Sequence, residues 1–343
     1  MKFLPVVTLC AALLLTSSGH AQNSSPLREG RIAYVMTDLF WSVYQTADAR
    51  EECPEGFNDG PREQFDQLFA GAGPLKVTDT QLMLEQITWH PETNHLEFPF
   101  KSVQGTKSWG MNLDGQTTPE DFQHPDGKAG IDNQVYRAVG CIIGFRGPDG
   151  VEYIFQNKAI IDEKYNRMMI ELEGVDDLRN DPQVDVNVYR GRDRLLTDAS
   201  GEQVVPGGTQ RVDRRWGKSL IRKTRGEIVD GVLITVPIDE LVVPWMNLRV
   251  PSIHRFKDAR FRLRLSETRA EGQLGAYADV DTWYYQLIRN DSTHHLSNGQ
   301  ISALSLYRAL TRFADAYPDP ATGANTAIST ALDIKLTQVF VVD

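Results

Sequence analysis

The hexapeptide FRLRLS, which begins at Phe261, alternates between apolar and charged side chains. In an extended chain successive side chains point to opposite faces, so Leu263 and Leu265 share one face with Phe261, while Arg262 and Arg264 share the other. A strand of this kind has one face in the core and one in solvent, as strands of antiparallel sheets do. The hexapeptide therefore predicts an antiparallel β architecture.

Other short runs of strand-forming residues surround this one, and Gly, Asp or Asn separate them. They are RIAYVMTDLFWSVYQT (31–46), CIIGF (141–145), VEYIF (151–155), NRMMIELEGV (166–175), VDVNVYRG (184–191), GVLITVPI (231–238) and GAYADVDTWYYQLI (275–288). Because no amphipathic helix of ordinary length separates these runs, they favour packed antiparallel sheets over a parallel sheet. We predict a mostly β protein, an antiparallel β-sandwich of jelly-roll type with a few peripheral helices.

Four further segments complete this expected architecture. The segment PREQFDQLFA (61–70) has helical spacing, and LMLEQITW and HLEFPF flank the polar stretch HPETN as in a hairpin (82–100). In the segment 299–317 an apolar stripe at helical spacing predicts a second helix, formed by Ile301, Leu304, Tyr307, Leu310 and Phe313. The final run DIKLTQVFVVD predicts a last strand.

Composition and charge exclude several classes of protein. The chain has 343 residues, 41% of them hydrophobic and 24% charged, so it can bury a sizeable core. Its 36 basic and 46 acidic residues give a net charge of −10, which argues against a nucleic acid as the main partner. Beyond the leader no run approaches the roughly twenty apolar residues that a membrane helix needs, so we expect no membrane insertion.

The first 21 residues, MKFLPVVTLCAALLLTSSGHA, have the features of a secretory signal peptide. A basic start at Lys2 precedes an apolar run, and small residues follow at Gly19 and Ala21. Residues 22–30 are polar and are expected to be flexible, and residues 31–343 are expected to form a single domain. We therefore expect the mature protein in the periplasm or outside the cell.

Two cysteines remain once the leader, which carries Cys10, is removed. Cys53 and Cys141 would then lie in a compartment where thiols oxidise, so we predict one disulfide between them. The alternative is a pair of buried free thiols. No His near either cysteine in the sequence suggests a catalytic thiol.

The segment 109–134 is rich in Asp, Asn and Gly and is the most unusual part of the chain. Oxygen ligands on a backbone bent by glycine are what Ca²⁺ requires, so we predict a structural Ca²⁺ site in this acidic loop. The predicted ligands are Asn112, Asp114, Asp121, Asp126, Asp132 and Asn133. The stretch NLDG resembles part of an EF-hand loop, and the repeated DG units resemble thrombospondin type 3 repeats, but no bidentate Glu follows at the required distance. The alternative is that the DG units only form turns.

The succession LDG, PDG and GIDNQ, followed by the later strands, resembles a family of exported bacterial proteins. The resemblance covers most of the mature chain. It implies export but brings no activity, cofactor or site residue with it.

A basic segment, RVDRRWGKSLIRKTR (211–225), stands out in this acidic chain. Guanidinium groups bind anions and Trp stacks on sugars, so we predict binding of a glycan or acidic polymer there. The predicted binding residues are Arg214, Arg215, Trp216 and Arg222. The alternative is a solvated loop whose charges aid solubility.

Signals for catalysis are weak. Glu171 and Glu173 share one face of a predicted strand and loosely resemble the paired acids of concanavalin-like glucanases, although only two acids are present. The sequence therefore favours an exported, calcium-stabilised β-sandwich with a binding or structural role at the cell envelope. The alternative is a secreted carbohydrate-active enzyme, a glycoside hydrolase or lyase, on a concanavalin-like sandwich.

Overall fold

The structure is a computed structural model, and it describes residues 25–58, 89–93, 100–147, 150–161, 167–215, 217–247, 250–291 and 303–342. The predicted signal peptide, the predicted helix at 61–70 and both flanks of the predicted hairpin lie largely outside these residues. Within that hairpin, the described part of HPETN forms the short 3-10 helix η1 (Pro91–Thr93).

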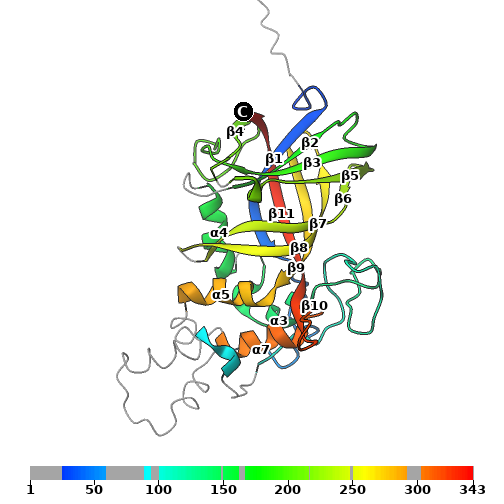
Figure 1. The fold of residues 1–343 in the computed structure, drawn as a ribbon, viewed down its shortest axis with the longest axis vertical. Helices are drawn as coiled ribbons and strands as arrows, with labels where there is room; N and C mark the ends of the chain where they lie inside the picture. Colours follow the sequence, from blue (N-terminus) through cyan, green and yellow to red (C-terminus); the bar gives the residue numbers. More distant parts are fainter. Residues whose placement is uncertain are drawn as a thin grey trace, which may run out of the picture.

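Eight antiparallel strands form a closed barrel (Figure 1). Their order around the barrel is β1 (Arg31–Trp41), β2 (Arg167–Glu173), β3 (Asp181–Gly191), β5 (Arg222–Val229), β6 (Val232–Thr235), β8 (Val250–Leu265), β9 (Arg269–Asp279) and β11 (Asn325–Val342). The barrel closes because β11 pairs with β1 as well as with β9, in a register that runs from Ala33 opposite Val339 to Trp41 opposite Leu332.

The prediction of a mostly β chain is confirmed, but the prediction of a sandwich is wrong. An alternating strand has one inner and one outer face in either architecture, so the pattern alone does not separate two packed sheets from one closed sheet. The difference lies in the pairing of β1 with β11, which joins strands about 300 residues apart in the chain.

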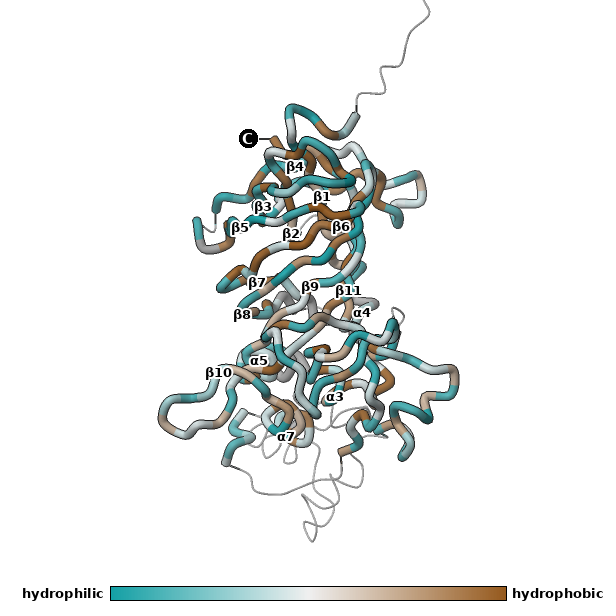
Figure 2. The backbone as a smooth tube through the Cα atoms, turned by 90° about the vertical axis from the view of Figure 1, so that its right-hand side faces the viewer, coloured by the Kyte–Doolittle hydropathy of each residue, from teal (hydrophilic) through white to brown (hydrophobic). Residues whose placement is uncertain are grey.

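The barrel interior is filled by side chains from all eight strands. Phe261, Leu263 and Leu265 are buried there, as their alternation predicts, while Arg262 and Arg264 are exposed on the outside. One continuous apolar cluster links strands all round the barrel, and Figure 2 shows apolar and polar segments side by side in the wall. Burial of this kind stabilises the fold by roughly 25 cal/mol per Å² of apolar surface.

Three further strands extend the barrel, and one of them positions the candidate site. β4 (Gly208–Arg211) and β10 (Ala316–Pro318) pair with β11, and β7 (Ile238–Asn247) pairs with β8. β6 occupies the C-terminal half of β8 and β7 occupies its N-terminal half, so β6 and β7 lie end to end along one partner strand. Residues 236–237 connect them, and beyond this connection β7 does not pair with β5.

In the part of the chain that the structure describes, four helices accompany the barrel: α3 (Gln134–Val139), α4 (Val151–Ile161), α5 (Val280–Asp291) and α7 (Ala303–Phe313). In Figures 1 and 2, α3, α5 and α7 lie beyond one end of the barrel. α7 confirms the helix predicted within 299–317, and β11 confirms the predicted last strand. No helix in the described residues is long and apolar enough to cross a membrane.

Three of the predicted strands are wrong in whole or in part. CIIGF contains the 3-10 helix η2 (Ile143–Phe145), VEYIF lies in α4, and the second half of GAYADVDTWYYQLI forms α5. A short apolar run fits a buried strand and a buried helix equally well, so periodicity does not separate the two.

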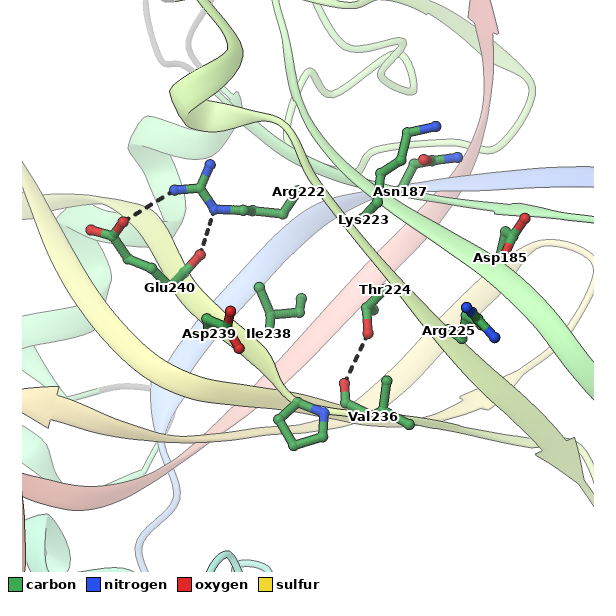
Figure 3. Close-up of a pocket in the computed structure, with 11 residues that line it drawn as sticks. Asp185, Asn187, Arg222, Lys223, Thr224, Arg225, Val236, Ile238, Asp239 and Glu240 are labelled. Carbon is green, nitrogen blue, oxygen red and sulfur yellow. Dashed lines mark hydrogen bonds and ion pairs between the residues drawn. The ribbon is translucent and has the colours of Figure 1, made fainter.

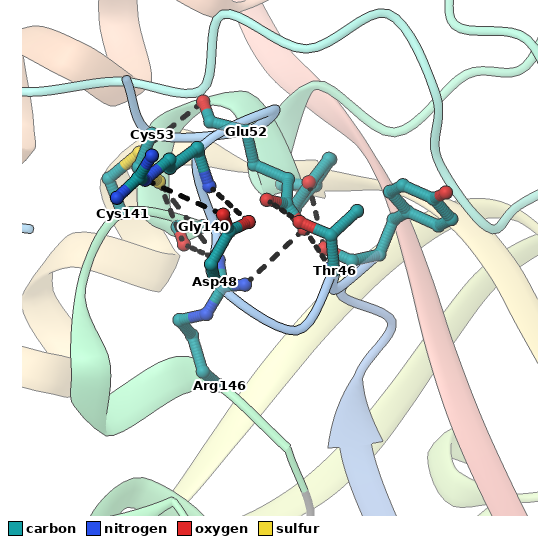
Figure 4. Close-up of polar contacts among 10 residues, drawn as sticks. Thr46, Asp48, Glu52, Cys53, Gly140, Cys141 and Arg146 are labelled. Carbon is teal, nitrogen blue, oxygen red and sulfur yellow. Dashed lines mark hydrogen bonds and ion pairs between the residues drawn. A yellow bond between two sulfur atoms is a disulfide. The ribbon is translucent and has the colours of Figure 1, made fainter. Parts of the chain in front are cut away.

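The predicted disulfide is confirmed. Cys53 and Cys141 are joined with an S–S distance of 2.04 Å and a Cα–Cα distance of 5.8 Å. Beside the disulfide, the buried Glu52 carboxylate accepts hydrogen bonds from the backbone and side chain of Thr46, and it lies 3.5 Å from Nη2 of Arg146 (Figure 4). Arg146 also donates to the carbonyl of Gly140 at 2.6 Å, so the ion pair ties the two disulfide-linked segments together a second time.

Candidate functional site

A cleft of about 640 Å³ opens on the outside of the barrel where β5 and β7 separate (Figure 3). We call it the β5–β7 cleft. Its walls are residues 222–225 of β5, residues 236–240 at the start of β7, and Asp185 and Asn187 of β3. At its narrow end the backbone N–H of Val236 donates to the carbonyl of Arg225 at 2.9 Å, and the Thr224 hydroxyl donates to the carbonyl of Val236 at 3.1 Å. The cleft is therefore held open by strands and their hydrogen bonds.

The register of β3 and β5 sets the side chains in the cleft. Val186 lies inside the barrel, so its neighbours Asp185 and Asn187 lie on the outer face. Asp185 stands opposite Arg225, and Asn187 stands opposite Lys223. The carboxylate of Asp185 and the amide of Asn187 thus each have a cationic residue beside them on β5.

Arg222 is held in the cleft wall by β7. Its Nε donates to the backbone carbonyl of Glu240 at 2.6 Å, and its Nη2 lies 3.3 Å from the Glu240 carboxylate. Arg255 of β8 donates to the other oxygen of the same carboxylate at 2.9 Å. These bonds fix the wall, so Lys223 and Arg225 are the cations more available to a ligand.

Asn187 is the unusual residue of the cleft. It is 1% exposed, and its Nδ2 is buried with no hydrogen-bond partner among the described residues. A buried donor without an acceptor costs about 1–3 kcal/mol, and most buried polar groups in proteins are satisfied. An acceptor on a ligand bound in the cleft would remove this cost.

Among the predicted binding residues that the structure describes, one lines the cleft. Arg222 lines the cleft, whereas Arg215 is bound on two nitrogens by the buried Asp213, each at 2.8 Å, and this pairing raises the pKa of Arg215. Arg214 is exposed outside the lining, and Trp216 lies outside the described residues. Lys223 and Arg225 belong to the same basic segment, but Asn187 comes from another strand, and nothing in the sequence marks it.

The two glutamates considered for catalysis lie on the outer face of β2, next to this region. Glu171 is buried and stands opposite Asn187 in the register. Burial raises the pKa of Tyr189, whose hydroxyl hydrogen-bonds the Glu171 carboxylate, and that carboxylate raises the pKa further. Glu173 forms an ion pair with Arg31 at 3.3 Å. Both carboxylates therefore have structural partners.

Four of the six predicted calcium ligands close turns within the acidic loop. The side chain of Asn112 accepts a hydrogen bond from the N–H of Gly115 at 2.6 Å, and that of Asp114 accepts one from the N–H of Gln116 at 2.7 Å. The Asp121 carboxylate accepts the N–H of Thr118 at 2.6 Å. The Asp126 carboxylate lies 2.7 Å from His124 and 3.6 Å from Lys128. These are the local bonds by which Asp and Asn stabilise turns. The described residues contain no group of three His, Cys, Asp or Glu side chains placed to hold a metal ion. Calcium binding by this loop stays a prediction.

The other two predicted ligands are buried and anchor the loop. The Asp132 carboxylate accepts the N–H of Leu113 at 2.5 Å, and burial raises its pKa to about 7. The Asn133 amide donates to the carbonyl of Ser42 at 3.0 Å and accepts the N–H of Ala331 at 3.2 Å. Asn133 therefore ties the loop to Ser42, directly after β1, and to the interior of β11.

Comparison of the chain with protein-family models, with curated proteins and with solved structures finds no match.

Proposed function

We propose that this protein is an exported glycan-binding protein and that the β5–β7 cleft holds the sugar. The observation that carries the proposal is Asn187, which lines the cleft and whose buried amide nitrogen has no partner among the described residues. Lys223 and Arg225 add donors beside it, and Asp185 adds an acceptor. Sugar hydroxyl groups both donate and accept, so they match a wall that offers both kinds of group.

The balance of charge favours a hydroxyl-rich ligand over a polyanion. Three cationic side chains line the cleft, and three carboxylates oppose them: Arg222, Lys223 and Arg225 against Asp185, Asp239 and Glu240. A polyanion would meet repulsion from the carboxylates, whereas hydroxyl groups can bond to both signs of charge. The cleft volume of about 640 Å³ also lies within the usual range of small-molecule sites, about 300–1,000 Å³.

The fold supports a binding role outside the cytoplasm. The cleft side chains stand on paired strands of a closed barrel, and rigid elements hold binding groups more accurately than loops do. The Cys53–Cys141 disulfide is stable in oxidising compartments, which agrees with the predicted signal peptide. We therefore propose that binding takes place in the periplasm or outside the cell.

The proposal is tested with a glycan array, followed by calorimetry on the sugars that bind. Replacing Asn187→Leu removes the amide donor at similar volume, and we expect about a tenfold loss of affinity, as for one hydrogen bond of about 1.4 kcal/mol. Lys223→Ala should weaken binding as well. The matched control is Lys335→Ala, which removes an exposed lysine on β11 outside the cleft and should leave affinity unchanged.

Two results would contradict the proposal. One is an array on which no neutral glycan binds. The other is equal affinity in Asn187→Leu and the unaltered protein. Retention on heparin that depends on Lys223 and Arg225, without binding of neutral sugars, would instead identify the ligand as an acidic polymer.

A further inference from the structure

A second cavity lies between the acidic loop and the barrel, on the other side of residues 236–237. It has a volume of about 520 Å³, and we call it the loop pocket. The acidic loop forms one wall, and the outer faces of β6 and β8 form the other. The loop is fixed against the barrel because Leu113 packs with Tyr277 of β9. Within the loop, Phe122 and Ile131 pair as in a β-bridge.

The ionisable side chains of the loop pocket are all of basic types. Arg260 and Arg262 come from β8, Lys128 and His124 come from the loop, and no acidic side chain lines the pocket in the described part of the chain. Asp126 neutralises part of the loop's charge through its pairs with His124 and Lys128. The two arginines have no ion pair among the described residues, so the pocket keeps a positive charge.

Arg260 carries the strongest sign of a missing ligand. Its Nε is buried and has no hydrogen-bond partner among the described residues. Its Nη1 reaches the carbonyl of Asn112 only at 3.5 Å, which is too long for a strong hydrogen bond. A guanidinium group is a planar fork of donors that matches a carboxylate.

The remaining surface of the pocket is mostly apolar. Met111 and Ile131 face it from the loop, and Ile234, Val236 and Phe261 line the barrel side. Ile234 is 41% exposed and Val236 is 54% exposed, although both are large apolar residues. Exposed apolar residues that form a patch mark a binding surface more often than isolated ones do.

We propose that the loop pocket binds a single-chain organic carboxylate, with its head group on Arg260 and Arg262 and its acyl chain along Ile234 and Val236. An inorganic anion would leave the apolar wall uncovered, and an uncharged chain would leave the Arg260 donor unpaired. Only an amphiphilic anion satisfies both parts of the pocket. This ligand differs in chemistry from the sugar proposed for the β5–β7 cleft, so either proposal can fail alone.

Calorimetry with the full mature protein tests the proposal, using decanoate below its micelle concentration. Decanol lacks the charge and acetate lacks the chain, and we expect each to bind at least about tenfold more weakly than decanoate. Arg262→Gln should weaken decanoate at least about tenfold, because it removes a charge-assisted hydrogen bond to the carboxylate. Arg264→Gln, one strand repeat away and outside the pocket, should leave the affinity unchanged.

Two further variants keep the test independent of any one substitution. Arg260→Gln should also lose affinity, and Ile234→Ser, which changes an exposed residue, should weaken decanoate without affecting the fold. Lys223→Ala in the β5–β7 cleft should leave decanoate binding unchanged. Absence of decanoate binding, equal binding of decanol, or unchanged affinity in both arginine variants would overturn the proposal.

Discussion

The free energy of unfolding should depend on pH because of Asp132 in the acidic loop, and the substitution Asp132→Asn should remove this dependence. Asp132 is 5% exposed, and burial raises the pKa of its carboxyl group from 3.8 to about 7. The carboxylates of Asp114 and Asp121 add to this rise, against the hydrogen bond from the N–H of Leu113. The folded protein therefore holds a proton that the unfolded chain releases.

The sign of the effect follows from which state holds the proton. Below about pH 4 both states are protonated, and the favourable contribution of Asp132 to folding is complete. Between about pH 4 and 7 the unfolded chain ionises first, so the free energy of unfolding falls as the pH rises. Above about pH 7 both states are ionised and the contribution is lost. The difference between 3.8 and about 7 corresponds to about 4 kcal/mol.

Asparagine stays neutral at every pH and keeps an oxygen that can accept the N–H of Leu113. The assay is urea unfolding of both proteins at pH 5 and at pH 8. The unfolded chain is already ionised at pH 5, so only the two pH units from 5 to about 7 contribute. We expect the variant to gain about 2.6 kcal/mol on the unaltered protein between these two conditions. Other carboxyl groups whose pKa is raised by burial, such as Asp315 and Asp333, affect both proteins equally, so their contribution cancels when the two proteins are compared.

Asp126→Asn is the matched control, because Asp126 lies in the same loop and has the opposite shift. The hydrogen bond from the backbone N–H of Lys128 lowers the pKa of the Asp126 carboxyl group, and the hydrogen bond with His124 lowers it further. This variant should therefore show no gain in stability at pH 8. An Asp132→Asn variant whose stability differs from the unaltered protein by the same amount at pH 5 and pH 8 would refute the reasoning.

Three further predictions concern the fold and the loop. Replacing Cys53 and Cys141 by Ala opens a loop of 88 residues and should cost about 4–5 kcal/mol in urea unfolding; equal stability would contradict this value. Leu263→Ala inside the barrel should cost about 2–5 kcal/mol, whereas Arg264→Ala outside it should change stability by less than about 0.5 kcal/mol; similar losses would contradict the assigned faces. If the acidic loop binds Ca²⁺, the melting temperature must be higher in calcium than in EDTA. Equal melting temperatures would contradict calcium binding and would mean that hydrogen bonds alone stabilise the turns.

The strands that the sequence predicts best are those with a strict alternation. Phe261 and Leu263 lie inside and Arg262 lies outside, as the period of two requires. Closure of the barrel is not predictable in this way, because it depends on the pairing of β1 with β11, and a local pattern carries no information on a distant partner. The run VEYIF fails for a different reason, since its apolar residues fit a helix as well as a strand.

Prediction of the candidate site was limited in the same way. The basic segment contains Arg222, Lys223 and Arg225, so the sequence locates one wall of the cleft. The other walls come from β3 and β7, which reach the cleft only through the strand register. Asn187 acquires its importance from burial without a partner, which no sequence pattern shows.

The position of β11 has a consequence for how the protein is made. This strand pairs with β1, β4, β9 and β10, and its contacts with β1 span about 300 residues of chain. A chain that emerges N-terminus first must therefore keep one edge of β1 and one edge of β9 unpaired until β11 has been made. Such long-range pairing slows folding, and unpaired edges favour aggregation. We expect the newly emerged chain to depend on a holding chaperone, and its yield to fall sharply when β11 is shortened.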